Sequence, residues 1–460
     1  MTCGQPLPAR TWSALAAVGV ACALIAAACQ RQGQSQGAAE TQAPSPDWAD
    51  PIRVAAGDGH RGPWRMNESD WRFVDDGTVA INDEGVIAVA WADHVKQDVL
   101  LQVFEPNGDA RFAEPKNISR SSDVFSWLPR IELGAGGAEE VFILWQEIVF
   151  SGGSHGGEIF FSRSLDGGER FEEPANLSQS RAGAGKGRLT RDRWNNGSFD
   201  LLRPDGGETL YAAWTEYEGR LWLTRSGDRG ESFAEPIALA GGDAGGEPPA
   251  RGPSLAAAPD GEMIYLAYAV GEDPSANIQL ATSTDAGASF GDPVTVAAGS
   301  GHADAPEIAT TKDGTLHLVF AESERGMFRD YDVFYTRRNA GEPAFEDASS
   351  ITGDQGEEHG SLHFPNLEVD DDDRLYASWE LYPSPQGRPR GLGFAAAQGG
   401  QDFGDPQVVP SSDDAELGLN GSQQGLLMRK LAASSGRIAI AHSTFRPGEN
   451  SAIWLYHAER

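Results

Sequence analysis

The sequence contains few cysteines and few basic residues. Only three of its 460 residues are cysteine, and Cys3, Cys22 and Cys29 all lie near the N-terminus. With at most one thiol after residue 28, the chain can form neither a framework of disulfide bonds nor a zinc site built from cysteines. Lysine and arginine number 36 against 68 aspartate and glutamate, which gives a net charge of −32. Because this charge repels a phosphate backbone, we predict that nucleic acid is not a partner.

The N-terminal segment has the parts of an export signal. Arg10 precedes an apolar run from Thr11 to Ala28, and this run ends in small residues directly before Cys29. Ala26-Ala27-Ala28-Cys29 resembles the lipobox of bacterial lipoproteins, in which the signal is removed and the new N-terminal cysteine is lipidated. The resemblance implies a signal peptide over residues 1–28 and lipidation of Cys29. An ordinary secretory signal and an uncleaved anchor are the alternatives, and each of them exports the chain.

The segment after Cys29 is expected to be a flexible tether. Residues 29–50 are rich in glutamine, glycine, serine, alanine and proline and lack hydrophobic periodicity. Residue 30 is glutamine, not the aspartate that commonly retains lipoproteins at the inner membrane. The resemblance therefore implies a protein of the cell envelope that the lipid on Cys29 anchors to an outer membrane.

A short motif recurs along the rest of the chain. Its form is Ser-x-Asp-x-Gly-x-x-Phe, and complete copies occur at Ser164, Asp166, Gly168 and Phe171, at Ser226, Asp228, Gly230 and Phe233, and at Ser283, Asp285, Gly287 and Phe290. Incomplete copies end at Phe112, Phe345 and Phe403, so successive phenylalanines are 55 to 62 residues apart. A fixed period of this length indicates an array of similar units. The aspartate can accept hydrogen bonds from turn amides and the glycine can adopt a positive φ, so we interpret the motif as structural.

Each unit also carries three further strand patterns. The second strand ends at an aromatic residue or its equivalent in seven places, at Trp91, Trp145, Trp214, Tyr268, Phe320, Trp379 and His442. A third strand follows each of these positions, and an inner strand, usually Pro-x-Ile or Pro-x-Leu, precedes it. With the short strand after each phenylalanine, a unit has four antiparallel strands, which is the form of a β-propeller blade.

These units predict an all-β, seven-bladed β-propeller over residues 51–460, with a six-bladed ring as the alternative. The seventh unit stops at Arg460, one strand short, while residues 50–54 resemble the short strands that follow each phenylalanine. We predict that Pro51 to Ala55 supplies the missing outer strand of the last blade. This pairing closes the ring and removes an open sheet edge.

The motif on a propeller resembles the Asp-box proteins of the sialidase superfamily, also called bacterial neuraminidase repeat proteins. The resemblance covers about residues 51–460 and implies the fold, but the superfamily includes sialidases, other glycosidases, lyases and proteins that only bind. Sialidases carry their first substrate-binding arginine in an Arg-Ile-Pro motif, whereas the nearest sequence here is Pro129-Arg130-Ile131. Sialidase propellers also have six blades. No catalytic triad is therefore carried over from the family.

The alternation of strand direction divides the loops between two faces. The loops from an outer to the next inner strand, and from second to third strand, share one face, which we call the loop face. The Ser-x-Asp-x-Gly turns lie on the opposite face, the turn face. Long loops at 60–72, 180–197, 322–332 and 381–391 belong to the loop face and concentrate arginine, tryptophan and histidine there. Long loops are common places for function, so we expect a binding site on this face.

The residue between proline and isoleucine or leucine of each inner strand should ring the mouth of the channel. These mouth positions are Thr78, Arg130, Asp200, Ser254, Glu307, Asn366 and Lys430. All are polar, as a wet channel mouth requires. The alternative is a ligand site in which Arg130 and Lys430 bind an anionic group while Asp200 or Glu307 transfers protons.

A retaining glycosidase needs two carboxyl groups about 5 Å apart, or a tyrosine with a glutamate. Glu216 with Tyr217, and Glu380 with Tyr382, end second strands at the loop face and are candidates for this pair. Arg251 is a further candidate for ligand binding there.

Histidines offer a rival chemistry on the same face. His302 with Asp304, and His359 with His363, precede adjacent inner strands. Three imidazoles and a carboxylate could hold zinc or provide the base of a polysaccharide lyase. The spacing has no tight metal motif, so we favour hydrogen-bonded histidines that contribute to ligand binding, and predict neither a metal ion nor another cofactor.

The sequence as a whole predicts an exported, lipid-anchored propeller that recognises a glycan or another extracellular ligand. One hypothesis is an exo-acting glycosidase on an acidic sugar, related in chemistry to sialidases. The other is a propeller that binds or assembles without catalysis, and a polysaccharide lyase is a further alternative. The sequence alone does not decide between an enzyme and a binding protein.

Overall fold

The computed structural model describes residues 46–121, 123–134, 139–149, 157–204, 207–242, 247–297, 301–383, 387–420 and 427–460. The described residues all belong to one compact unit, Gln42–Arg460. The signal peptide and the lipidation of Cys29 therefore lie outside the described residues. Among the described residues, no helix is long and apolar enough to cross a membrane.

Four separate sheets each contain four antiparallel strands in chain order. Their strands are β3 (Val74–Ile81), β4 (Ile87–Asp93), β5 (Asp98–Phe104) and β6 (Lys116–Asn117); β7 (Ser126–Leu133), β8 (Val141–Glu147), β9 (Glu158–Ser164) and β10 (Ala175–Asn176); β13 (Phe199–Leu202), β14 (Leu210–Thr215), β15 (Leu221–Ser226) and β16 (Ile237–Ala240); β25 (Ser361–Val369), β26 (Arg374–Tyr382), β27 (Leu392–Gln398) and β28 (Gln407–Val408).

Two larger sheets and a hairpin complete the strands. The eight-stranded sheet holds β17 (Ala250–Ala257), β18 (Ile264–Glu272), β19 (Ser275–Ser283), β20 (Val294–Ala297), β21 (His302–Thr310), β22 (Leu316–Ser323), β23 (Asp332–Arg338) and β24 (Ser349–Ser350). The six-stranded sheet holds β1 (Asp47–Trp48), β2 (Ile52–Asp58), β29 (Leu419–Asn420), β30 (Leu431–Ser434), β31 (Arg437–Arg446) and β32 (Asn450–Glu459). The hairpin is β11 (Lys186–Thr190) with β12 (Arg193–Asn196), and one short helix, α1 (Gln355–His359), precedes β25.

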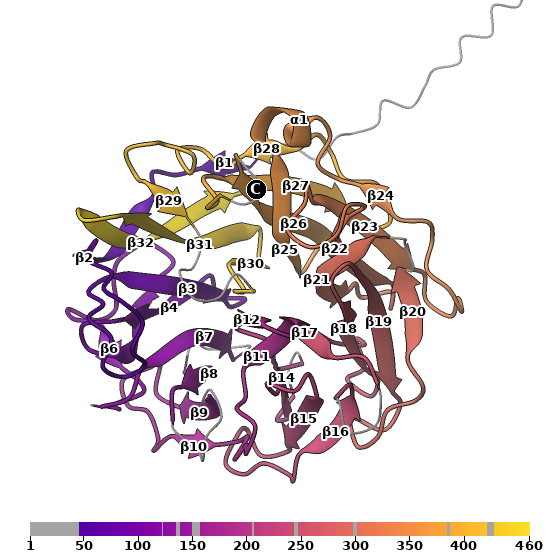
Figure 1. The fold of residues 1–460 in the computed structure, drawn as a ribbon, viewed down its shortest axis with the longest axis horizontal. Coiled ribbons are helices and arrows are strands. Elements are labelled where there is room, and N and C mark those ends of the chain that lie inside the picture. The colour runs from indigo at the N-terminus through magenta and orange to yellow at the C-terminus, as the bar shows by residue number, and fades with distance from the viewer. Residues whose placement is uncertain are drawn as a thin grey trace, which may run out of the picture. The chain divides into compact units, whose positions relative to one another are not determined.

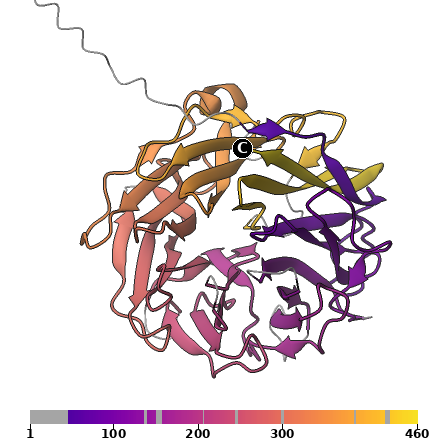
Figure 2. The ribbon, with the colours of Figure 1, turned by 180° about the vertical axis from the view of Figure 1, so that it is seen from behind.

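The sheets of residues 46–460 are arranged around a common centre as a β-propeller (Figures 1 and 2). Strands β3, β7, β17, β21, β25 and β30 face the centre in Figure 1, and β12 also lies near it. A count of the blades gives five, not the seven or six predicted from the repeats. Neighbouring meanders are not all separate sheets, because a parallel bridge between Ala276 and His302 joins β17–β20 to β21–β24.

The N-terminal strand closes the last sheet, as the sequence predicts. Strand β2 runs antiparallel to β32, with Ile52 opposite Leu455, and supplies the outer strand that the C-terminal segment lacks. Asp47 and Trp48, which the sequence assigned to the tether, also pair with β32 as strand β1. Both ends of the propeller chain therefore meet in one sheet, which leaves no unpaired inner edge between them.

The core lies between neighbouring sheets and is built from the repeated positions. The seven residues that end the second-strand pattern, Trp91, Trp145, Trp214, Tyr268, Phe320, Trp379 and His442, are all buried. The Ser-x-Asp-x-Gly-x-x-Phe turns repeat one set of hydrogen bonds: in each of the three, the serine hydroxyl accepts the glycine N–H and the aspartate accepts the N–H four residues later. Their glycines have φ between 75° and 88°, and their phenylalanines pack against the core. These aspartates therefore hold turns together, on the turn face.

A shared irregularity shapes the inner strands. Pairing with the second strand shifts between Asp75 and Thr78, Trp127 and Arg130, Arg251 and Ser254, Asp304 and Glu307, and His363 and Asn366. The residue after the first of each pair has a φ between 51° and 58°: Asp76, Leu128, Gly252, Ala305 and Phe364. In four of these five strands the next residue is the proline of the Pro-x-Ile/Leu pattern, so this pattern marks a β-bulge. In four of these five strands the bulge lies between two polar residues that are three apart in sequence, whereas β7 has Trp127 before its bulge and Arg130 after it.

Candidate functional site

The seven mouth positions are equivalent in the structure. Each one pairs with the residue directly before the buried position that ends the second strand, for example Thr78 with Ala90 and Glu307 with Val319. Asp200 pairs in the same way with Ala213, and the Lys430 carbonyl accepts the N–H of Ala441. Two polar clusters are built on or beside these positions, one inside the channel and one at the loop face.

The channel cluster consists of Arg429 and four carboxyl groups, those of Glu132, Asp200, Glu307 and Glu368. Arg429 donates to Glu132 at 2.9 Å and to Asp200 at 3.1 Å. Glu307 accepts from the Ser254 hydroxyl at 3.0 Å. One guanidinium group thus donates hydrogen bonds to carboxyl groups on two inner strands, β7 and β13.

Burial sets the protonation of this cluster. It raises the pKa of Glu307 to about 7, although the charge of Arg429 opposes the shift. Burial likewise raises the pKa of Glu368 to about 8. Asp200, which is bonded to Arg429, lies close enough to raise the pKa of Glu307 by charge repulsion. A protonatable carboxyl group beside an ion-paired one is the arrangement that acid–base catalysis uses, and it is also a stable way to bury several acids.

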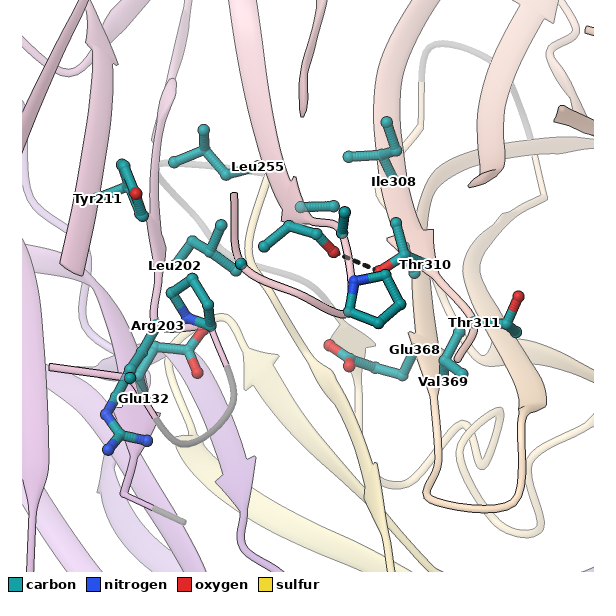
Figure 3. Close-up of a pocket in the computed structure, with 18 of the residues that line it drawn as sticks. Glu132, Leu202, Arg203, Tyr211, Leu255, Ile308, Thr310, Thr311, Glu368 and Val369 are labelled. Carbon is teal, nitrogen blue, oxygen red and sulfur yellow. Dashed lines mark hydrogen bonds between the residues drawn. The ribbon is translucent and has the colours of Figure 1, made fainter. Parts of the chain in front are cut away.

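A cavity of about 570 Å³ adjoins the channel cluster at the turn-face end of the inner strands (Figure 3). Its lining includes Glu132, Glu368 and Arg429 of the cluster, and Arg203 and Lys312 beside them. Arg203 is held by Glu140 at 3.1 Å. The cluster is therefore approached from the face opposite the one where the sequence predicts the site.

The mouth cluster lies at the loop face and consists of Arg251, His302, Asp304, Tyr331 and His363. Arg251 contacts Asp304 at 3.1 Å and His302 Nε2 at 3.2 Å. His302 Nδ1 lies 2.8 Å from the Tyr331 hydroxyl, and the ring of Tyr331 stacks on His363 with centroids 3.8 Å apart. The structure thus brings together four residues that the sequence singled out and adds Tyr331 from the loop at 322–332.

Hydrogen-bond donors and acceptors fix the state of His302. Arginine can only donate, so Nε2 of His302 accepts from Arg251 and Nδ1–H donates to the Tyr331 oxygen. Burial lowers the pKa of His302 and, for His363, lowers it to about 3, so both rings are neutral at pH 7. Burial also raises the pKa of Tyr331. Both ring nitrogens of His302 are engaged, which leaves none for the zinc site considered from the sequence. His359, at the end of α1, lies instead 3.8 Å from Glu358.

The hairpin of β11 and β12 covers the mouth cluster. The Arg188 carbonyl accepts from Arg251 at 3.4 Å, and the Leu189 carbonyl accepts the Asp273 N–H at 3.1 Å. Gly187 must be glycine here because a side chain would lie 2.5 Å from Arg251 Cβ. Arg193 reaches over the ring of Phe328 at 4.2 Å. The cluster is consequently buried, with His302, Tyr331 and His363 each at most 3% exposed.

Arg130 and Lys430, predicted to bind an anion, are engaged within the protein. Arg130 donates to the carbonyls of Pro129, Gly197 and Leu427, and burial lowers its pKa to about 10. Lys430 forms a buried ion pair with Glu380. An anionic ligand would have to replace these partners, so neither cation is poised for that role in this structure.

The other predicted catalytic pairs are not members of either cluster, although Glu380 lies opposite His363 in the pairing of β25 with β26. Glu216 lines a separate cavity of about 540 Å³ between loops, and burial raises its pKa. The ring of Tyr217 stacks on Trp194 at 4.2 Å. Tyr382 is buried beside Phe364, its hydroxyl has no hydrogen-bond partner, and burial followed by the charge of Glu380 raises its pKa. None of these tyrosines has the lowered pKa expected of a nucleophile.

An exposed tryptophan lies on the loop face. Trp64 is 44% exposed and stacks on Trp127 with centroids 5.3 Å apart. Arg61 lies over the neighbouring Trp71 ring at 5.3 Å, and burial followed by the charge of Arg388 lowers the Arg61 pKa. An aromatic surface and two nearby guanidinium groups therefore lie together on the loop face.

The sequence contains signals for the residues that the prediction missed. Glu132 and Glu368 stand two residues after the mouth positions Arg130 and Asn366, and alternate residues of a strand share a face. Arg251, Asp304 and His363, which the sequence did single out, each stand three residues before a mouth position, on the other side of the bulge. Tyr331 has no such signal, because a loop brings it to the cluster.

No protein-family model and no curated protein matches the sequence. Solved structures do match, among them the polysaccharide lyase Uly1, with 12% identity, a TM-score of 0.55 and coverage of 90% of this chain and 99% of that chain. A polysaccharide lyase described as an ulvan lyase bound to -[GlcA(1-4)Rha3S]- matches with 11% identity and a TM-score of 0.53, over 89% of this chain and 96% of that chain. The NanB sialidase from Streptococcus pneumoniae matches with 9% identity and a TM-score of 0.48, over 73% of this chain and 68% of that chain. At these identities the likeness shows the β-propeller fold alone.

Proposed function

We propose that this protein is a glycan-acting propeller that binds at its loop face and cleaves an acidic sugar chain over the mouth cluster. The observation that carries the proposal is the hydrogen-bonded series Arg251, His302 and Tyr331, which comes from separate parts of the chain and ends in a tyrosine hydroxyl. The polysaccharide lyases to which the fold is similar are consistent with a sugar ligand.

The chemistry of the series suits cleavage of a glycosidic bond. Such cleavage needs a proton donor at the leaving oxygen and a group that accepts a proton or attacks the sugar. His302 donates Nδ1–H to the Tyr331 oxygen, so the hydrogen of the Tyr331 hydroxyl points elsewhere and is available to the leaving oxygen. Displacement of the β11–β12 hairpin would open the cluster to the ligand.

The choice of an acidic sugar rests on charge. The chain carries a net charge of −32, yet Arg61 and Arg388 lie close enough on the loop face for one to lower the pKa of the other. Like charges held together favour an anionic ligand between or beside them. A carboxylate of a sialic or uronic acid fits this requirement.

A panel of sialylated and uronate-containing glycans tests the proposal. Hydrolysis yields a new reducing end, whereas elimination also yields an unsaturated product that absorbs in the ultraviolet, so the products distinguish a glycosidase from a lyase. In Tyr331→Phe, kcat should fall about 10²–10⁴-fold, as for loss of an acid–base group. The control Tyr456→Phe removes another buried tyrosine hydroxyl and should keep the activity. Absence of turnover on every substrate would overturn the enzymatic proposal.

The second candidate is recognition without catalysis. It is favoured by the burial of the mouth cluster, whose polar groups largely satisfy one another, and by the exposed Trp64, which suits stacking against a sugar ring. In that case Trp64→Ala weakens glycan binding on an array, while Tyr331→Phe changes binding little and no product forms.

We further propose that the propeller is exported and held in the cell envelope, at an outer membrane, by lipid on Cys29. The proposal rests on the apolar run before Ala26-Ala27-Ala28-Cys29. Mass spectrometry of the N-terminal peptide from expressing cells should find a diacylglyceryl cysteine, and Cys29→Ser should release the protein from the membrane fraction. An unmodified cysteine would contradict the proposal.

We also propose that the ring has seven blades of four strands. Support comes from the single parallel bridge that joins β17–β20 to β21–β24, and from the pairing of β2 with β32, the last strand of the chain. Seven equivalent mouth positions agree with this division. An experimental structure in which the sheets cannot be divided at Ala276 and His302 would reject it.

A further inference from the structure

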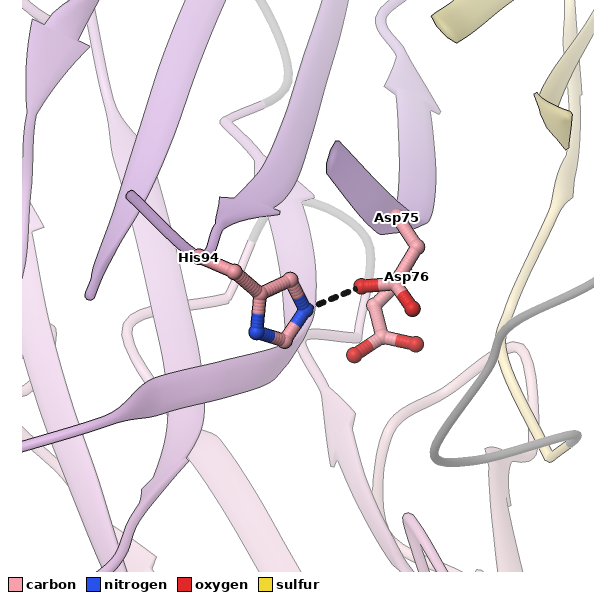
Figure 4. A group of neighbouring side chains, drawn as sticks. All are labelled: Asp75, Asp76 and His94. Carbon is pink, nitrogen blue, oxygen red and sulfur yellow. Dashed lines mark hydrogen bonds and ion pairs between the residues drawn. The ribbon is translucent and has the colours of Figure 1, made fainter. Parts of the chain in front are cut away.

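Three buried side chains on the first inner strand and its neighbour form a group unlike the two clusters described above. Asp75 and Asp76 lie on β3 and His94 directly follows β4 (Figure 4). One ligand-type atom from each residue lies within 4.8 Å of those of the other two, and each residue is at most 2% exposed. His94 Nε2 lies 2.7 Å from Asp75 Oδ1.

Asp76 is the unusual member. Neither of its carboxylate oxygens has a hydrogen-bond partner, although the side chain is fully buried, and His94 Nδ1 is also without one. A buried carboxylate normally receives several hydrogen bonds, or a cation, because it loses its hydration on burial. Asp76 sits at the β-bulge with a φ of 57°, so the backbone is held in a left-handed conformation that a non-glycine residue seldom adopts. In Figure 4 its carboxyl group lies beside that of Asp75, near the imidazole.

We propose that Asp75, Asp76 and His94 bind one divalent transition-metal ion, of the zinc or manganese kind. Two carboxylates and one imidazole are ligands that these ions accept, whereas calcium prefers oxygen ligands alone. Two carboxylates carry a charge that one divalent cation balances. Lys430 is paired with Glu380 and Arg130 donates to carbonyls, while the charge of Arg61 acts on Asp75. Asp76 is the carboxyl group of the three-residue site whose oxygens have no hydrogen-bond partner.

The dimensions permit such an ion. Zinc lies about 2.0–2.2 Å from nitrogen and carboxylate oxygen, so tetrahedral donors are about 3.3 Å apart. The contact between His94 and Asp75 would open slightly, while Asp76 would move toward the pair. Phe73, Trp71 and Phe125 surround the imidazole at centroid distances of 4.3, 5.3 and 5.4 Å, so the ring is held in place by packing. Three protein ligands leave a fourth position for water or a ligand group.

The position of Asp75 on its inner strand would place the ion near the mouth of the channel. Asp75 stands before its bulge as Arg251, Asp304 and His363 stand before theirs. The ion would therefore lie on the same level of the channel as the mouth cluster, on a different inner strand. Because the sequence predicted no metal, the inference comes only from the way the bulge brings Asp76 beside Asp75 and His94.

Metal binding to the untagged full-length protein tests the site. The protein is freed of metal with EDTA and is then dialysed with Zn²⁺ or Mn²⁺. After removal of excess ion, elemental analysis should find about one equivalent per chain, and Tm should rise by about 5 °C with the ion present. Asp76→Asn and His94→Gln should each lose the bound equivalent. The control Glu368→Gln removes a buried carboxyl group of the channel cluster and should retain it.

Two results would overturn the proposal. One is wild-type protein that binds well below one equivalent and shows no metal-dependent change in Tm. The other is retention of the ion by Asp76→Asn or by His94→Gln. Should neither variant fold, the wild-type stoichiometry and its loss to EDTA still decide the question, because they need no substitution.

Discussion

The channel cluster and the mouth cluster are buried in the same fold, yet burial shifts the pKa values of their groups in opposite directions. In the channel cluster four carboxyl groups surround Arg429, and burial raises the pKa of Glu307 and Glu368. In the mouth cluster the one carboxylate, Asp304, is bonded to Arg251, and burial lowers the pKa of His302 and His363. Burial disfavours charge in both places, and acids and bases respond with opposite shifts.

Acid is therefore expected to destabilise the protein through the mouth cluster, and alkali through the channel cluster. A buried neutral histidine is protonated more readily in the unfolded chain, so acid favours unfolding. A buried neutral carboxyl group is ionised more readily in the unfolded chain, so alkali favours unfolding. The substitutions below separate the two contributions.

The largest effect is expected for Arg429→Met. The change leaves Glu132 and Asp200 without their shared cation in a buried site. Removal of one partner of a buried ion pair typically costs about 3–5 kcal/mol of unfolding free energy, and two carboxylates lose their partner here. Urea unfolding at pH 7 measures the loss. A cost below about 1 kcal/mol would mean that the carboxyl groups are already protonated at that pH, and would weaken the comparison.

Acid should destabilise the mouth cluster through His363. Its pKa is lowered from 6.5 to about 3 in the folded protein, so its contribution is complete above pH 6.5 and is lost as the pH falls toward 3. His363→Gln should flatten the fall in Tm between pH 6.5 and 4 relative to wild type. A parallel fall in both proteins would show that His363 does not titrate as the structure requires. The exposed His60 offers the control His60→Gln, which replaces a histidine outside the mouth cluster.

Alkali should destabilise the channel cluster through Glu368. Its pKa is raised from 4.5 to about 8, so its contribution is complete below pH 4.5 and is lost as the pH rises through 8. Glu368→Gln keeps the shape without the charge, and its Tm should change less between pH 6 and 9. Thermal unfolding across that range measures the difference. Equal slopes for variant and wild type would contradict the assignment.

The smallest effect is expected outside both clusters, at the repeated turns. Hydrogen bonds from the Ser232 side chain and amide lower the pKa of Asp228 to about 2. Its contribution is therefore present above the ordinary value of 3.8 and is lost as the pH falls toward 2. Asp228→Asn should lower Tm slightly at pH 7, less than Arg429→Met does, and should leave any glycan cleavage unchanged. Loss of activity in this variant would contradict a purely structural turn.

The repeated positions made the fold predictable to a large extent. The seven buried second-strand ends, the polar mouth positions and the closing strand all follow from side-chain alternation and period, which are local properties of a strand. The number of separate sheets did not follow, because one parallel bridge at Ala276 and His302 joins two repeats that the sequence treats alike. The pairing of Asp47 and Trp48 with β32 was missed because the flanking residues lack strand periodicity.

The candidate site was predictable only in its members. His302, Asp304 and His363 were named from their places before inner strands and Arg251 as a further ligand-binding candidate, but the hydrogen bonds among them join residues of different strands and cannot be read from the sequence. Arg130 and Lys430 were expected to meet a ligand and instead meet carbonyls and Glu380. Gly197 and Glu380 lie 67 and 50 residues from Arg130 and Lys430 in the sequence, so no local pattern specifies these partners.

The sequence by itself determined the units, their four strands, the buried aromatic positions and the polar ring, because strand periodicity and turn chemistry act over a few residues. Tertiary structure alone decided which polar groups share a site, which of them are neutral, and which face carries an open cavity. These depend on desolvation and on distances between residues that are far apart in the chain. The arrangement of Asp75, Asp76 and His94 is the clearest case, since it exists only after the first inner strand has formed its bulge.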